Sequence, residues 1–176
     1  YNNGRGGVLV RGHTSAGRHR IVNNVIYDNA SRGILLQAKN SVIDHNTVVH
    51  NNVGSFQPPC DNAQIVVNGA TNLVRNNISL WADYDRPDFC IDGLPVDPAG
   101  PFPVQMQGNL FGDVDPLFVD AAAHDYRLLP GSPAIDAGVT IPEVETDFDG
   151  AVRPQGPGSD IGAYEMPDIT PPVAPV

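Results

Sequence analysis

The chain has 176 residues, of which 41% are hydrophobic and 17% are charged, so it can bury a core as one domain. Its 20 acidic residues outnumber its 10 basic ones, and the formal charge of −10 disfavours nucleic acid and anionic membranes as partners. The 17 prolines and 18 glycines indicate many turns and little helix, and no apolar run reaches membrane-spanning length, which argues against membrane insertion.

The first recognisable strand covers residues 6–12, GGVLVRG, and a polar corner at residues 13–20 follows it. Strand and corner hold the only basic cluster of the chain, which consists of Arg11, His13, Arg18, His19 and Arg20. Arginine pairs with carboxylates in a two-pronged geometry, so this cluster could hold an acidic sugar. The alternative is a solvated loop, because runs of charge usually face water.

An internal repeat follows, in which an apolar residue precedes an asparagine by three places. The four copies are residues 21–26, 43–48, 74–79 and 106–111, and the shared asparagines are Asn24, Asn46, Asn77 and Asn109. These asparagines are 22, 31 and 32 residues apart, which suits short coils whose later copies carry insertions. The apolar runs are too short for helices and typical of strands. An asparagine at every corner tolerates a left-handed backbone and can bond the next coil, which predicts stacked coils.

The pattern I-x-x-N-x-I-x-x-N…G-I-x-L of residues 21–36 resembles the repeat of right-handed parallel β-helix proteins, the pectate lyase-like group, over residues 1–119. The resemblance implies an all-β fold, a right-handed single-stranded parallel β-helix or solenoid, whose coils are incomplete at the N-terminus. It places these residues in the core: Ile21, Asn24, Ile26, Asn29, Ile34, Leu36, Ile43, Asn46, Val48, Asn51, Ile65 and Val67. It does not select a function, because β-helices serve as lyases, hydrolases, adhesins and structural rods.

Alignment on the asparagine column brings polar residues of neighbouring coils together. It places Asp44 beside Val22 and Arg75, His45 beside Asn23 and Asn76, and Asp28 beside His50 and Trp81. Asp44, His45 and His50 then lie near one another, and a carboxylate with a histidine is a candidate acid–base pair. The alternative is that these histidines only form hydrogen bonds at the corners.

In pectate lyase-like enzymes the strand equivalent to residues 8–10, 34–36 and 65–67 carries the active groove, with aspartates for calcium and a basic residue as proton acceptor. Here the outward positions are Leu9, Leu35 and Val66, and then Arg11, Gln37 and Asn68, without an acidic cluster. The apolar stripe favours a surface that another segment or a partner covers. The residues expected to contact carbohydrate are Arg11, His13, Gln37, Lys39, Asn68 and Trp81, and the catalytic residues are unknown.

Two insertions, residues 56–63 and 82–103, carry the two cysteines, Cys60 and Cys90. The insertions lie about one coil apart, so the thiols could be adjacent. In an acidic chain with a single lysine, two cysteines favour one disulfide and therefore an oxidising compartment. The alternative is two unrelated thiols.

The sequence changes character after Asn109. DPLFVD at 115–120, DYRLLPGSPAIDAG at 125–138, DFDGAVRP at 147–154 and DIGAYE at 160–165 resemble the C-terminal closing segment of bacterial surface β-helix proteins, the choice-of-anchor Q group. The resemblance implies a protein that is secreted or held at the cell surface. We expect residues 120–165 to form an irregular closing segment that seals the last coil, and residues 166–176 to form a proline-rich linker.

Alternating carboxylates at a glycine turn, as in residues 147–150, are how calcium loops begin. Asp147, Asp149 and Asp160 are therefore candidate calcium ligands, and turn and capping roles are the alternative.

Three functions of different classes fit these features. We expect first a secreted or cell-surface module that recognises a polysaccharide or a surface protein without catalysis. The second is the C-terminal part of a polysaccharide lyase or glycoside hydrolase that acts on acidic glycans. The third is a structural rod or filament subunit that associates end to end or laterally with copies of itself.

Overall fold

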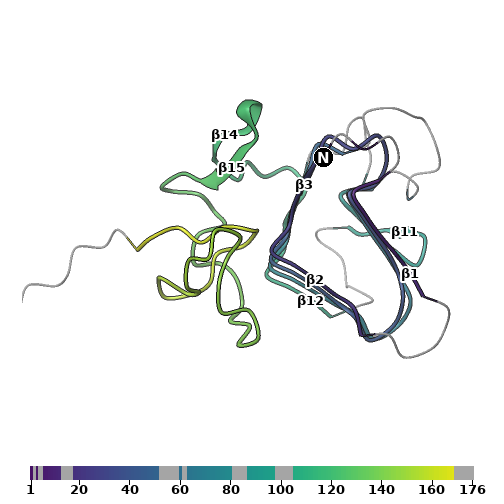
Figure 1. Ribbon diagram of the computed structural model, residues 1–176. Coiled ribbons are helices and arrows are strands. Elements are labelled where there is room, and N and C mark those ends of the chain that lie inside the picture. Colours follow the sequence, from purple (N-terminus) through teal and green to yellow (C-terminus); the bar gives the residue numbers. More distant parts are fainter. Residues whose placement is uncertain are drawn as a thin grey trace, which may run out of the picture.

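The computed structural model describes residues 1, 3, 6–12, 18–51, 60, 63–80, 87–97 and 105–168. Within these ranges the regular structure is β apart from 3₁₀ turns, at Cys60 and in η2 (Ala121–Ala123). Three parallel sheets stand around a common interior, and Figure 1 views them nearly along the stack, so that the strands of successive coils overlie one another. This arrangement is consistent with a β-solenoid, and no helix in the described ranges is long and apolar enough to cross a membrane.

Each coil contributes one strand to each of three sheets, which we name sheets A, B and C. Sheet A contains β1 (Val8–Arg11), β4 (Ile34–Gln37), β7 (Ile65–Asn68) and β10 (Phe89–Ile91), with β11 (Leu94–Pro95) added antiparallel. Sheet B contains β2 (Arg20–Val22), β5 (Val42–Asp44), β8 (Leu73–Arg75) and β12 (Gln105–Gln107). Sheet C contains β3 (Val25–Tyr27), β6 (Thr47–Val49), β9 (Ile78–Leu80) and β13 (Leu110–Phe111). The predicted stacking of coils is confirmed.

The predicted core residues lie in the interior of the stack. Ile34, Leu36, Ile43, Val48 and Ile65 are fully buried in one apolar cluster. Burial of an aliphatic side chain of this size contributes about 1.5–3 kcal/mol to folding. Of the twelve predicted core positions, eleven are buried and Asn24 is half-buried.

The asparagine column forms a continuous ladder of side-chain amides. Asn24 Nδ2 donates to Asn46 Oδ1 over 2.8 Å, Asn46 Nδ2 donates to Asn77 Oδ1 over 2.9 Å, and Asn77 Nδ2 donates to Asn109 Oδ1 over 2.9 Å. The left-handed residue is the one before each ladder asparagine, not the asparagine itself. Asn23, His45 and Asn76 have φ of 55°, 52° and 55°, and this turn aims the next side chain along the stack.

The outer face of sheet A is covered as predicted at two of its three apolar positions. Leu35 and Val66 are buried with Ala63 and Cys90, whereas Leu9 is 55% exposed. Cys60 and Cys90 form a disulfide with their Cα atoms 5.5 Å apart, so that prediction is also confirmed. A disulfide indicates a non-reducing setting.

Residues after β13 form a second layer that begins with an antiparallel hairpin of β14 (Phe118–Asp120) and β15 (Asp125–Leu128). The apolar side chains that this layer shares with the outer face of sheet C are Val49, Ile78, Leu80, Phe118, Tyr126, Leu128, Ala134 and Ile161. Because sheet C turns valine, isoleucine and leucine outward, its outer face needs an apolar cover.

The closing segment lies along the side of the stack, as Figure 1 shows, instead of sealing only the last coil. Its hydrogen bonds reach three successive coils. Asn23 Nδ2 donates to the Thr146 carbonyl over 2.6 Å, and Asn76 Nδ2 donates to the Val139 carbonyl over 2.7 Å. The Ala163 N–H donates to Thr47 Oγ1 over 2.9 Å.

Candidate functional site

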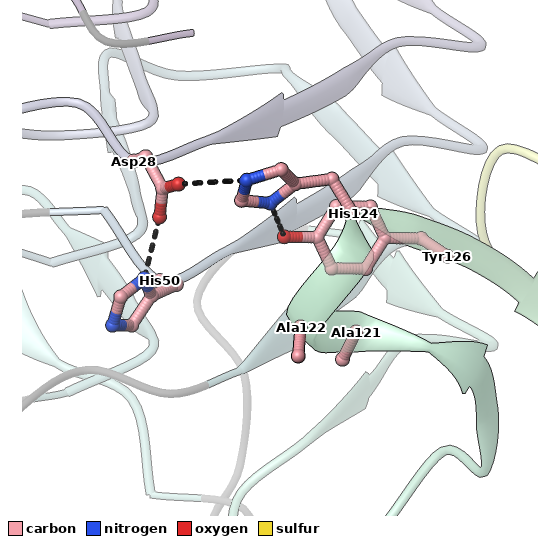
Figure 2. A pocket seen from close by; sticks show the side chains of 6 residues that line it. All are labelled: Asp28, His50, Ala121, Ala122, His124 and Tyr126. Carbon is pink, nitrogen blue, oxygen red and sulfur yellow. Dashed lines mark hydrogen bonds and ion pairs between the residues drawn. The ribbon is translucent and has the colours of Figure 1, made fainter.

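A hollow of about 390 Å³ lies where the closing segment meets the corner after sheet C. Two of its lining residues come from the coils and four from the hairpin of the closing segment; they are Asp28, His50, Ala121, Ala122, His124 and Tyr126. Its volume falls in the range of small-molecule sites in proteins. The arrangement of these six side chains is shown in Figure 2.

Asp28 and His50 occupy the same corner of successive coils. Each directly follows a strand of sheet C, and the Asp28 N–H donates to the His50 carbonyl over 3.1 Å. Their φ angles of 53° and 50° are left-handed, which aspartate and histidine adopt more readily than most side chains. The sharp turn directs both side chains away from the core and toward the closing segment.

His124 and Tyr126 reach the hollow from the other side. His124 ends the η2 turn with φ of 61°, and Tyr126 follows on β15. Tyr126 is almost fully buried, and its ring contacts Tyr27 and Phe118 with ring centres 5.3 and 5.2 Å away. Burial raises the pKa of the Tyr126 hydroxyl, so the hydroxyl keeps its proton at neutral pH.

Asp28 lies between two imidazoles (Figure 2). His50 Nδ1 is 2.5 Å from Asp28 Oδ1, and His124 Nε2 is 3.5 Å from Asp28 Oδ2. His124 Nδ1 is in turn 3.3 Å from Tyr126 Oη, and the His124 ring stacks on Tyr27 at 4.4 Å. The polar wall of the hollow is therefore one connected chain of two hydrogen-bond contacts and one ion-pair contact.

The hollow combines this polar wall with an apolar floor. The methyl groups of Ala121 and Ala122 provide the floor, and carboxylate and imidazole groups provide the wall. A saccharide also has separate apolar and polar surfaces, because the C–H face of a pyranose is apolar and its rim carries hydroxyls. The site can thus hold a ring against the floor while its hydroxyls bond the wall.

The row of residues predicted for carbohydrate lies on sheet A and does not line the hollow. Arg11 pairs with Gln37 and Gln37 with Asn68, so the three occupy equivalent positions on β1, β4 and β7. Arg11, Gln37 and Lys39 are exposed, and Asn68 is half-buried. His13 and Trp81 lie outside the described residues.

The predicted group of Asp44, His45 and His50 is not brought together as an acid–base site. Asp44 accepts two hydrogen bonds from Arg75, from Nε over 3.0 Å and from Nη2 over 2.7 Å. His45 is fully buried with its Nε2 2.9 Å from Asn76 Nδ2, whereas His50 lies at the next corner with Asp28. The column alignment places neighbours correctly, but the left-handed corner sends successive side chains in different directions.

The predicted calcium ligands take turn roles. Asp147 Oδ1 accepts from the N–H groups of Asp149 and Ala151 over 2.9 and 2.7 Å, and Asp147 Oδ2 accepts from the Glu165 N–H over 2.8 Å. Asp160 accepts from the Asp136 and Met166 N–H groups over 2.8 and 2.7 Å. In the described ranges no three His, Cys, Asp or Glu residues are placed to hold a metal ion. Calcium binding stays a prediction.

Sequence reasoning missed the buried ion pair of Arg153 and Glu165. Both side chains are 1% exposed, and Arg153 Nη1 lies 2.5 Å from Glu165 Oε2. Arg153 also donates to the carbonyls of Asp160 and Gly162 over 3.1 and 2.9 Å. An arginine and a glutamate in a segment without a repeat carry no periodic signal, so their pairing emerges only from the folded chain.

Comparison of the chain with protein-family models, with curated proteins and with solved structures finds no match in any of the three.

His45 gives a pH-dependent stability. Burial and the nearby Arg153 lower its pKa from 6.5 to about 3, so it is neutral in the folded chain at pH 7. Below pH 6.5 the unfolded chain takes up a proton that the folded chain refuses, and stability is lost as the pH falls toward 3. We expect the proton uptake at this residue alone to lower the free energy of unfolding by about 2 kcal/mol between about pH 7 and pH 5. Urea unfolding at the two pH values measures this loss.

His45→Asn is the matched control, because Asn23 and Asn76 occupy the equivalent left-handed positions in the neighbouring coils. Burial raises the pKa of Asp160 and Glu165, but both carboxyl groups are present in either protein and cancel in the comparison. An equal loss of stability on acidification in both proteins would contradict this assignment.

Proposed function

We propose that the chain belongs to a secreted or cell-surface module, a right-handed parallel β-helix of the pectate lyase-like kind with a closing segment of the choice-of-anchor Q kind, that recognises carbohydrate without catalysis. The observation that carries the proposal is the hollow, where an apolar floor meets a wall of one carboxylate and two imidazoles.

Two features support the fold and setting of this module. The parallel sheets and the amide ladder from Asn24 to Asn109 are what a β-helix requires for stacking its coils. The disulfide of Cys60 and Cys90 supports an oxidising compartment such as the cell exterior.

The charge of the hollow favours an uncharged sugar. Among the described residues that line the hollow, Asp28 is the one carboxylate and there is no lysine or arginine. A uronic acid in this hollow would bring a second carboxylate close to Asp28, and like charges at short range repel. The row of Arg11, Gln37 and Asn68 on sheet A is a separate candidate contact for a longer chain of sugars.

A binding screen with a blocking variant tests the proposal. Ala122 lines the hollow, and we expect Ala122→Trp to fill it and to weaken binding of neutral oligosaccharides on a glycan array by about a hundredfold or more. Ala123 is exposed on the same turn and does not line the hollow, so Ala123→Trp should bind as the unaltered chain does. Absence of glycan binding, or equal binding by both variants, would overturn the proposal.

A polysaccharide-cleaving function is the second candidate, and the bond from His50 to Asp28 is the observation that favours it. A carboxylate that orients an imidazole prepares the other ring nitrogen to accept a proton from water or from a substrate. Release of reducing or unsaturated sugar ends by the chain, abolished by His50→Asn, would place this candidate first.

A further inference from the structure

We infer that His50 Nε2 is the hydrogen-bond acceptor through which the hollow selects its ligand, so that an uncharged saccharide must donate a hydroxyl to it. This inference rests on the proposed function and assigns the specificity to one atom. It follows from the distribution of protons along the chain of four side chains in Figure 2.

The first step is Asp28. An ionised carboxylate only accepts hydrogen bonds, so each imidazole nitrogen that faces it must carry a proton. The two nitrogens that face it are Nδ1 of His50, at 2.5 Å from Oδ1, and Nε2 of His124, at 3.5 Å from Oδ2.

The second step is the partner of His124 Nδ1. Tyr126 Oη lies 3.3 Å from His124 Nδ1, and burial keeps the proton on this hydroxyl by raising its pKa. The hydroxyl can then donate to Nδ1 while Nε2 faces Asp28, so that both nitrogens of His124 have partners inside the protein. Stacking on Tyr27 holds the ring in this orientation.

The third step leaves one open position. With its proton on Nδ1, a neutral His50 presents a lone pair at Nε2, on the side of the ring away from Asp28. The His50 side chain is 45% exposed and lines the hollow, so a ligand can reach it. Among the described residues, no hydrogen-bond partner is assigned to Nε2 of His50.

The chemistry of this position defines the ligand. A hydroxyl can donate to Nε2 while the ring to which it belongs lies on Ala121 and Ala122. A carboxylate or a sulfate can only accept, and it would face a lone pair and the charge of Asp28. The hollow therefore selects neutral, hydroxyl-rich rings over acidic ones.

The test uses the whole chain and the methyl glycosides of glucose, galactose and mannose, with the methyl glycoside of galacturonic acid, whose carboxylate is free, as the acidic comparison. Nitrogen-15 NMR of the histidine side chains at about pH 8 should show His50 protonated on Nδ1 and His124 on Nε2. We expect at least one neutral glycoside to bind, galacturonate to bind about tenfold more weakly, and His50→Asn to lose about tenfold in affinity.

A proton on Nε2 of His50 in the NMR spectra would overturn the inference. So would glycoside binding that Ala122→Trp abolishes but that His50→Asn does not weaken, and saccharide recognition would then stand without it. If no glycoside binds, the proposed function fails and this inference fails with it.

Discussion

Replacement of Arg153 by methionine is expected to lower the free energy of unfolding by about 3–5 kcal/mol, the cost of removing one partner of a buried ion pair. The Arg153 guanidinium bonds Glu165 and the carbonyls of Asp160 and Gly162, and both charged side chains are 1% exposed. Methionine fills a similar volume but leaves the carboxylate of Glu165 without its cation. The N–H groups of Gln155 and Asp160 still bond that carboxylate, at 2.9 and 3.0 Å, yet they carry no compensating charge.

Urea unfolding at neutral pH measures this effect, and the chain offers a matched control. Arg127 pairs with Asp125 on the surface of β15 with 59% of its side chain exposed, so Arg127→Met should leave the urea midpoint unchanged. A second variant, Arg153→Met with Glu165→Leu, removes both charges and should recover part of the loss. Equal midpoints for Arg153→Met and Arg127→Met would show that the buried pair does not hold the closing segment.

The repeating part of the fold could be predicted from the sequence because its signal is periodic. Ile34 and Ile65 stand at equivalent places in two copies of one pattern, and the structure pairs them in adjacent strands. Asn46 stands in the same column as Asn24 and Asn77, and the structure bonds it to both. A period fixes which residues are neighbours along the stack, since each coil can only bury its apolar face against the next.

Only the part of the hollow that the coils provide could be predicted, because only the coils have a periodic sequence. Asp28 and His50 share a column, and their proximity follows from the repeat. His124 and Tyr126 belong to a segment without a period, and no pattern in the sequence shows that this segment lies along sheet C. Its position depends on the outward apolar residues of three coils together, such as Val49 and Ile78, which is a property of the folded stack.

The sequence predicts the left-handed conformation at the ladder asparagine of each corner. In the structure the residue before that asparagine takes it. His45 and Asn76 take the strained turn, and the asparagine that follows each one bonds the neighbouring coil. Asparagine suits both tasks, so the sequence alone did not separate the residue that turns the chain from the residue that joins the coils.

Asn46→Ala is expected to lower the free energy of unfolding by about 3 kcal/mol, because it removes the centre of the amide ladder from a fully buried site. Asn46 Nδ2 donates to the carbonyls of Ile21 and Asp44 over 2.9 and 3.1 Å, and to Asn77 over 2.9 Å. Its Oδ1 accepts from the backbone N–H of Asn24 over 3.0 Å. Alanine removes this partner from the Ile21 carbonyl and from the Asn24 N–H, and a buried group left without a partner costs about 1–3 kcal/mol. The Asp44 carbonyl and Asn77 Oδ1 keep their bonds from the backbone N–H groups of residues 23 and 46.

The half-buried end of the ladder provides the control. Asn24 Nδ2 donates to the Val22 carbonyl over 3.0 Å and to Asn46, and the exposed part of this site lets water replace the lost bonds. Asn24→Ala should therefore lower the free energy of unfolding, measured in urea, by less than half as much as Asn46→Ala does. In Asn46→Ala, hydrogen exchange at the Asn24 N–H should accelerate, because its acceptor is Asn46 Oδ1. If the two variants were equally stable, the strength of the stack would lie in its apolar core and its backbone ladders, and the amide column would serve only to set the register of the coils.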